Sequence, residues 1–95
     1  MHASKSVAMK MLCTPVQVRA ARVLLGWSQQ KLADEADVSR STLALVERGD
    51  NLANNASRER IQRALEKAGL EFLPPDATKG SGIRYANHQT ERDVG

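Results

Sequence analysis

Signals that start and stop helices recur at short intervals over residues 14–69, and they restrict this part of the chain to short helices. Thr14-Pro15-Val16-Gln17 has the sequence of a capping box, with proline in the first turn where no backbone N–H is needed. Ser28 and Ser39 are further N-cap candidates. Glycines 26, 49 and 69 are placed to end helices. The pattern predicts helices over 15–25, 29–36, 40–48 and from the loop 50–55 to about 68.

Apolar residues fall on one face of each expected helix, which favours a layer of helices packed around a shared core. These residues are Val18, Ala21 and Leu25, then Leu32, Ala33 and Ala36, then Leu43 and Val46, and finally Ile61, Ala64, Leu65 and Ala68. Aromatic residues make up only 3% of the 95 residues, so the core is aliphatic and alanine-rich. Close-packed helices suit that composition better than a β-sandwich does, and the length indicates one domain.

Beyond Gly69 the apolar pattern changes to that of short strands. Leu70–Leu73 is a strand-like run closed by two prolines, and Ile83–Tyr85 follows a glycine-rich turn. We therefore expect a mobile arm over 1–13, a helical domain over 14–69, a strand extension over 70–85 and a polar tail over 86–95. The extension is our candidate for dimerisation, through strand pairing and apolar burial.

Composition excludes several classes of protein. A single cysteine, Cys13, excludes an internal disulfide framework and a multi-cysteine zinc site. His2 and His88 lie near opposite ends of the sequence, so we expect no metal and no cofactor. No apolar run approaches the roughly 20 residues that span a bilayer, and a cytoplasmic protein without a membrane partner is the simple interpretation. The net charge of +3 and the pI near 9.4 are compatible with a polyanionic partner.

The segment from Gln29 to Arg48 carries the functional information. Two short helices joined by a corner of about three residues form a helix-turn-helix arrangement. Such a pair needs a small residue where the helices cross, and Ala33 supplies it. It also needs apolar residues beneath the corner, which are Leu32, Val38, Leu43 and Val46.

These residues resemble the Cro/C1 (Xre) family of phage-repressor-like helix-turn-helix proteins. The matching stretches are Leu24-Leu25-Gly26-Trp27-Ser28-Gln29-Gln30-Lys31-Leu32-Ala33, Val38-Ser39-Arg40-Ser41-Thr42-Leu43 and Val46-Glu47-Arg48-Gly49. The resemblance implies an all-α, compact, lambda-repressor-like bundle of four to five helices, with the strand extension appended to it. It also implies a homodimer that binds a two-fold-symmetric operator in double-stranded DNA. Helix 40–48 would then enter the major groove while the preceding helix crosses the backbone.

The resemblance and the chemistry of helix ends together define a candidate DNA-binding set. It comprises Ser28, Gln29, Ser39, Arg40, Ser41, Thr42, Ala44, Leu45 and Arg48. By resemblance, Gln29 and Thr42 contact phosphates, whereas Arg40 and Ser41 read bases. The free N–H groups and positive partial charge of a helix N-terminus independently suit a phosphate, and Ser28 and Ser39 each begin a helix.

Three further positions carry expectations of their own. Arg40 has a planar guanidinium suited to O6 and N7 of guanine. By resemblance, Ala44 and Leu45 approach bases further along the groove. Leu45 contacts only apolar atoms there, such as a thymine methyl, or else it is a partly buried packing residue.

A structural ion pair is also implied by the resemblance. Arg22 and Glu47 match a family pair that links the first helix to the end of the recognition helix. Such a pair orients the recognition helix and does not touch DNA.

Two residues depart from the family pattern. Asp37 stands where the family usually has glycine, at a position that tends toward positive φ. Arg58 occupies a position in the fourth helix that is often apolar. The basic residues of that helix are interspersed with acidic ones, which favours a solvated face over a DNA contact.

Two other functional classes compete with DNA binding. The same fold serves as a protein-binding module, an antitoxin or anti-activator whose main partner is another protein, and the polar tail would then fasten that partner. An enzyme has no support, because the sequence holds no paired-carboxylate site, phosphate-binding glycine loop or Cys-His arrangement at plausible spacing.

Overall fold

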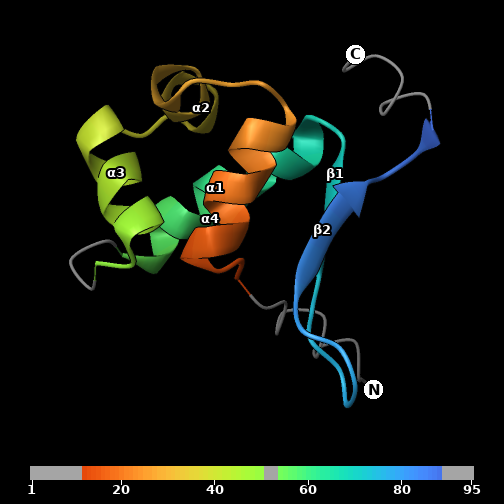
Figure 1. The fold of residues 1–95 in the computed structure, drawn as a ribbon. Coiled ribbons are helices and arrows are strands. Elements are labelled where there is room, and N and C mark those ends of the chain that lie inside the picture. The colour runs from red at the N-terminus through yellow and green to blue at the C-terminus, as the bar shows by residue number, and fades with distance from the viewer. Residues whose placement is uncertain (1–11, 51–53, 89–95) are drawn as a thin grey trace, which may run out of the picture.

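The computed structural model describes residues 12–50 and 54–88 of the chain, and these form a helical layer followed by one hairpin (Figure 1). The elements are α1 (Pro15–Leu24), α2 (Gln29–Ala36), α3 (Arg40–Arg48), α4 (Asn55–Lys67), β1 (Leu70–Leu73) and β2 (Gly82–Tyr85). The two strands pair antiparallel with each other. The expected fold class, a helical bundle with a short C-terminal hairpin, is confirmed.

Each helix begins at a side chain that accepts a hydrogen bond from the backbone N–H three residues later. These N-caps are Thr14, Ser28, Ser39 and Asn54. The capping box of α1 is complete, because Thr14 Oγ1 accepts from the Gln17 N–H at 3.1 Å and Gln17 Oε1 accepts from the Thr14 N–H at 2.9 Å. The helix starts are therefore fixed by local chemistry.

The core lies where α4 packs against the other three helices. Its largest fully buried side chains are Leu32, Leu43, Ile61, Leu65, Val18 and Val46. Ala33 is also fully buried, as a close crossing of α2 and α3 requires, and Val38 is half-buried beneath the corner. The apolar faces expected from the sequence thus meet in one core.

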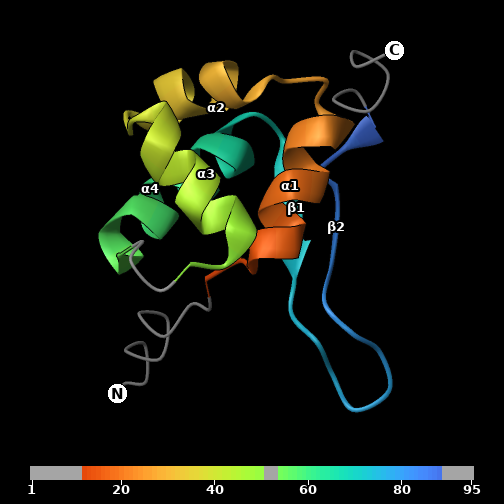
Figure 2. The same cartoon turned by 60° about the vertical axis from the view of Figure 1, so that its left-hand side comes forward.

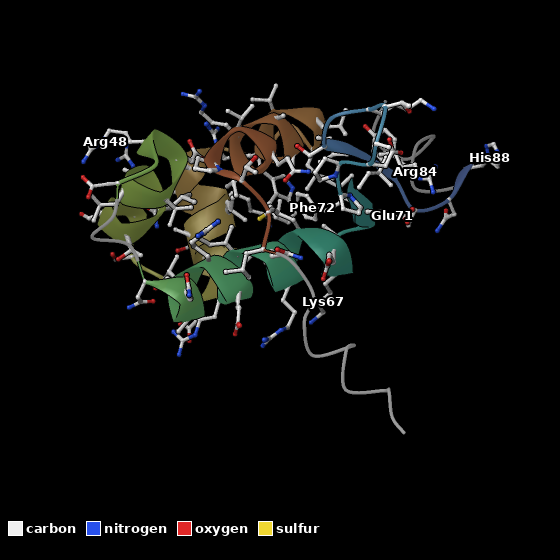
Figure 3. All side chains as sticks on the ribbon, turned by 90° about the horizontal axis from the view of Figure 1, so that it is seen from below. Arg48, Lys67, Glu71, Phe72, Arg84 and His88 are labelled. Atoms are coloured by element: carbon white, nitrogen blue, oxygen red, sulfur yellow. The ribbon has the colours of Figure 1, made fainter. Side chains whose placement is uncertain are left out.

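The hairpin covers part of this core and is bonded to it. Leu70 is buried, and the facing residues Phe72 and Ile83 are half-buried against the helices. The Gln17 side-chain amide donates to the Gly82 carbonyl at 2.8 Å. On the outer face, Arg84 Nε donates to Glu71 Oε1 at 2.9 Å (Figure 3). Residues 70–85 are therefore an integral part of the domain.

The chain before α1 differs from the arm expected over 1–13. Cys13 is 2% exposed and belongs to the core. Its N–H donates to Gln62 Oε1 at 2.6 Å, and its carbonyl accepts from Arg58 Nη2 at 2.9 Å. The assignment of Cys13 to a mobile arm is therefore wrong, because two side chains of α4 hold its backbone. Residues 1–11, and residues 89–95 of the expected tail, lie outside the described part.

The same contact explains why the fourth helix tolerates a charged residue at an often apolar position. Arg58 lies half-buried, and its guanidinium reaches a backbone carbonyl. A second small difference is the end of α1, which stops at Leu24, so that Leu25 is the C-cap and not the last helical residue.

Asp37 ends α2 in the left-handed conformation, with φ 59° and ψ 47°. Its N–H bonds to the carbonyls of Ala33 and Asp34, which closes the helix. A β-carbon is unfavourable in this conformation, and a carboxylate at a helix C-terminus opposes the negative end of the helix dipole. Asp37 therefore costs the domain stability on both counts.

We expect Asp37→Gly to stabilise the domain by up to about 1 kcal/mol, a rise of roughly 4–8 °C in Tm, because glycine removes both penalties. Thermal unfolding followed by circular dichroism measures this change. Asp37→Ala is the control, since it removes the carboxylate but keeps the β-carbon, and its Tm should rise by less than that of Asp37→Gly. An equal gain in both variants would show that charge and not backbone conformation limits stability here.

Candidate nucleic-acid interface

A sharp corner joins α2 to α3, and both helices lie at the surface of the bundle. The Val38 N–H donates to the Ala33 carbonyl at 3.0 Å, which turns the chain sharply after α2. Figure 2 looks onto α3, with α1 and α4 to either side of it and α2 above. The start of α3 and its outward face are thus presented to solvent on one side of the molecule.

All of the candidate DNA-binding residues lie on α3 or at the N-termini of α2 and α3. Ser28, Ser39, Arg40, Ser41 and Arg48 are exposed, whereas Gln29, Thr42, Ala44 and Leu45 are half-buried. The inward residues of α3 are Leu43, Val46 and Glu47. The helix therefore divides into a face that packs and a face that is open to a partner.

The helix N-termini are organised by their caps. Ser39 Oγ accepts from the Thr42 N–H at 3.0 Å and also bonds to Thr42 Oγ1 at 2.9 Å. Ser28 Oγ accepts from the Lys31 N–H at 3.0 Å. In each helix the cap satisfies one N–H of the first turn, while the N–H groups of the first two helical residues have no partner within the helix. Such groups can bind an anion.

Arg40 differs from the other arginine of α3. It is exposed, and its guanidinium takes part in no hydrogen bond or ion pair with any residue in the described part of the chain. Arg48 also lies at the surface, where its Nη2 is 3.7 Å from Asp50 Oδ2. The guanidinium at the start of α3 is therefore available to an external partner.

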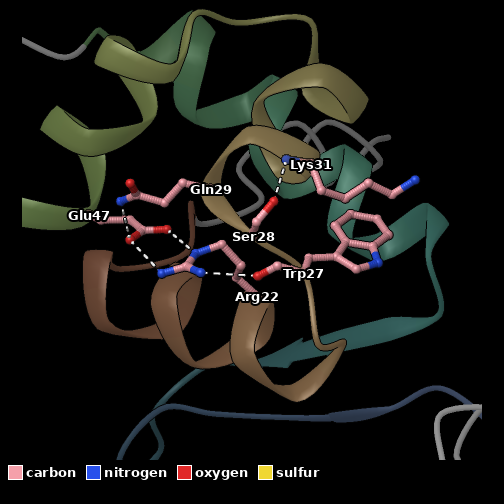
Figure 4. A network of polar contacts seen from close by, with 6 residues as sticks. All are labelled: Arg22, Trp27, Ser28, Gln29, Lys31 and Glu47. Carbon is pink, nitrogen blue, oxygen red and sulfur yellow. Dashed lines mark hydrogen bonds and ion pairs between the residues drawn. The ribbon is translucent and has the colours of Figure 1, made fainter.

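A network of polar contacts joins α1, the start of α2 and the end of α3 (Figure 4). Arg22 Nε donates to Glu47 Oε2 at 2.7 Å, and Arg22 Nη2 donates to Glu47 Oε1 at 3.2 Å. Arg22 Nη1 also donates to the Trp27 carbonyl at 3.0 Å. The Arg22 side chain is 17% exposed and that of Glu47 is 4% exposed. The pair implied by the family resemblance is thus present, bidentate and largely buried.

Gln29 belongs to this network, which sequence reasoning missed. Its Nε2 donates to Glu47 Oε1 at 3.2 Å, so that Glu47 holds the first residue of α2 as well as α1. An amide nitrogen carries two hydrogens, and Glu47 takes only one of them. No short-range sequence signal identifies this bond, because its two residues lie 18 positions apart.

Lys31 is a second feature that the sequence did not indicate. Its Nζ lies 5.5 Å from the centroid of the Trp27 ring (Figure 4). It also lies 3.1 Å from Glu35 Oε2. The side chain of Lys31, in the first turn of α2, thus lies over Trp27. The spacing of Trp27 and Lys31 across an N-cap is the signal that would have pointed to it.

A family comparison agrees with this geometry. The sequence model of a helix-turn-helix family matches residues 18–72, more than half of the chain. The chain belongs to this Cro/C1-type, Xre-like helix-turn-helix family. The family is one of DNA-binding regulatory domains and not of enzymes, and this chain is a DNA-binding helix-turn-helix regulator in that general sense. A search of curated proteins finds no match.

None of the helices in the described part of the chain has both the length and the hydropathy needed to span a membrane. Over residues 12–50 and 54–88 there is also no group of three or more histidine, cysteine, aspartate or glutamate side chains placed to hold a metal ion.

We expect Glu47→Ala to destabilise the domain by about 3–5 kcal/mol, because it leaves the Arg22 guanidinium in a largely buried site without its partner. The same change should weaken DNA binding, since the end of α3 loses its link to α1. Denaturant unfolding and a binding titration on the same preparation measure both effects. Unchanged unfolding with lost binding would show that Glu47 acts directly on the ligand.

Glu35→Ala is the matched control for this variant. Glu35 forms an exposed pair with Lys31, and pairs of that kind contribute only about 0.3–0.5 kcal/mol. The double variant Arg22→Met/Glu47→Met should recover much of the loss in stability, because removal of both charges leaves none uncompensated.

Proposed function

We propose that this chain is a sequence-specific regulator of transcription that binds double-stranded DNA as a homodimer and acts as a repressor. The observation that carries the proposal is the free Arg40 guanidinium at the exposed start of α3, on a helix whose far end is fixed by the Arg22–Glu47 pair. A rigidly held helix with an unengaged arginine is suited to reading base edges in a major groove.

Phosphate contacts would position the helix. The N-termini of α2 and α3 offer backbone N–H groups to two phosphates, and the second amide hydrogen of Gln29 lies at the first of these N-termini. Ser41 and Thr42 add hydroxyl groups at the second. Ser28 and Ser39 act by capping these helix ends.

Base contacts would give the sequence preference. Arg40 would donate two hydrogen bonds to O6 and N7 of a guanine, a contact that discriminates by about 1–3 kcal/mol. Ala44 and Leu45 are half-buried on α3 and offer apolar atoms to a thymine methyl. Arg48, at the exposed end of the helix, would contact the DNA backbone or a base beyond them.

A homodimer would place two such helices on an inverted repeat, with half-sites about 34 Å apart along the DNA. The binding needs no cofactor or metal ion, and DNA in the cytoplasm is the expected partner.

Selection of bound sequences from a random DNA pool tests this function. We expect the wild type to enrich an inverted repeat, and Arg40→Ala to lose or relax that preference. Arg63→Ala is the control, because Arg63 is also exposed but lies on α4, away from the proposed contacts. No enrichment by the wild type would overturn the proposal and would favour the protein-binding module.

Affinity should also fall steeply as salt concentration rises. Neutralised phosphates release counterions, so that a plot of log K against log salt should be linear with a slope of about −0.9 for each phosphate contacted. Titrations of the selected operator at several salt concentrations measure the slope. A slope near zero would contradict the phosphate contacts.

A further inference from the structure

The outward face of α1 carries an apolar stripe that no part of the described chain covers. Val16 is 66% exposed and Val23 is 68% exposed, and they are the large hydrophobic side chains that stand out as exposed in the described residues. Ala20, also exposed, lies between them at helical spacing, and the exposed Arg19 borders the stripe. The opposite face of α1 packs Val18 and Ala21 into the core, so the stripe faces directly away from the bundle.

The neighbouring strand, β2, has an open edge. The Ala86 N–H donates to the Gly69 carbonyl at 2.7 Å, and the register pairs Leu70 with Tyr85 and Phe72 with Ile83. Because antiparallel pairs alternate, the backbone groups of Ile83 and Tyr85 point away from β1. None of the hydrogen bonds of the described residues uses these groups. Figure 2 shows β2 on the outer side of the hairpin.

The stripe and the edge form one continuous surface. Gln17 donates to the Gly82 carbonyl and the Leu24 carbonyl accepts from the Tyr85 hydroxyl at 3.3 Å, so these two positions of α1 face β2. Ala20 is three residues after Gln17 and four before Leu24, which places it on the same side of the helix. Val16 and Val23 lie next to Ala20 around the axis of α1, further from β2. We call Val16, Ala20, Val23 and the outer edge of β2 the α1–β2 surface.

The other edge of the hairpin has a different neighbour. β1 packs beside α4, whose solvent-facing positions carry charged residues. These are Glu59, Arg60, Arg63 and Lys67. Burial of that flank against a partner would remove charges from water at a cost, whereas the α1–β2 surface offers apolar side chains and unpaired backbone groups.

We propose that the α1–β2 surface binds a second copy of this chain, by antiparallel pairing of the two β2 edges and packing of the two α1 stripes. This names the contact surface of the proposed homodimer and rests on that proposal. A β2 edge is self-complementary, since a two-fold axis pairs the same outward groups of Ile83 and Tyr85 from both copies. The edge of a four-residue strand buries too little surface area for a stable interface, and the adjoining α1 stripe would add to the buried area.

This arrangement leaves the proposed DNA-binding residues free. Arg22 faces α3, and it lies on the flank of α1 away from the side where Gln17 and Leu24 contact β2. None of the candidate DNA-contacting residues belongs to the α1–β2 surface. Two copies can therefore associate and still present both α3 helices.

Sedimentation of the full chain over a range of concentrations tests the inference. We expect the wild type to be a dimer, and Val16→Glu/Val23→Glu to be a monomer with a dissociation constant raised at least 100-fold. Both valines are exposed, so this variant should keep the Tm of the wild type within a few degrees. Arg63→Glu is the matched control, because it changes the net charge by the same −2 on the outer face of α4 and should remain a dimer.

Amide hydrogen exchange locates the contact independently of any variant. The N–H groups of Ile83 and Tyr85 should exchange more slowly at concentrations where the chain is a dimer, while those of Leu70 and Phe72 at the β1 edge should not change. Concentration-dependent protection at β1 alone would overturn the inference. A wild-type chain that stays monomeric at all concentrations would overturn it as well.

The two proposals fail in distinguishable ways. If the wild type dimerises through the α1–β2 surface but selects no DNA sequence, the proposed function is wrong and the inference stands. If the wild type selects DNA but Val16→Glu/Val23→Glu remains a dimer, the inference is wrong and DNA binding stands. If both proposals hold, Val16→Glu/Val23→Glu should be a monomer. This variant should bind the full inverted repeat weakly, but its sequence preference within one half-site should be that of the wild type.

Discussion

The bidentate pair of Arg22 and Glu47 is the constraint on which the geometry of this domain depends. Apolar packing is non-directional and tolerates small rotations of one helix against another. A largely buried guanidinium and carboxylate tolerate little, because any rotation that breaks the 2.7 Å contact leaves uncompensated charge inside the protein. The pair spans 25 positions of the sequence and fixes α3 against α1. Its bonds to Trp27 and Gln29 extend that constraint to the start of α2.

This arrangement separates stability from recognition on a helix of nine residues. Leu43, Val46 and Glu47 hold α3 to the bundle, and Ser39 caps it. Arg40 has no structural role among the described residues, so its side chain is available to bind a partner. If Arg40 held α3 in position, the helix would lose a stabilising contact whenever the arginine turned toward a ligand. The proposed base contact would therefore break none of the interactions that hold α3 in place.

The features that were predictable from the sequence are those set by local chemistry. The bounds of α2 and α3 and the capping box of α1 depend on neighbours within a few positions. The left-handed conformation of Asp37 was expected only from the family resemblance. Contacts between distant positions were not predictable in the same way. The bond from Gln17 to Gly82 and the packing of Cys13 against α4 join residues 65 and 49 positions apart. Arg22 and Glu47 were paired only through the family resemblance, since neither residue signals its partner locally.

In the proposed dimer, the hairpin would serve both the monomer and the assembly. Leu70 and Gln17 tie it to the core, so removal of residues 70–85 would unfold part of the domain along with any interface. Its outer edge contributes nothing to that core. In such a dimer, once one copy has bound its half-site, the second copy would be at high effective concentration at the other half-site. A single copy would make fewer phosphate contacts and would bind more weakly. If the dimer is weak, occupancy of the operator would depend steeply on the concentration of the protein itself, and the α1–β2 surface would set the threshold.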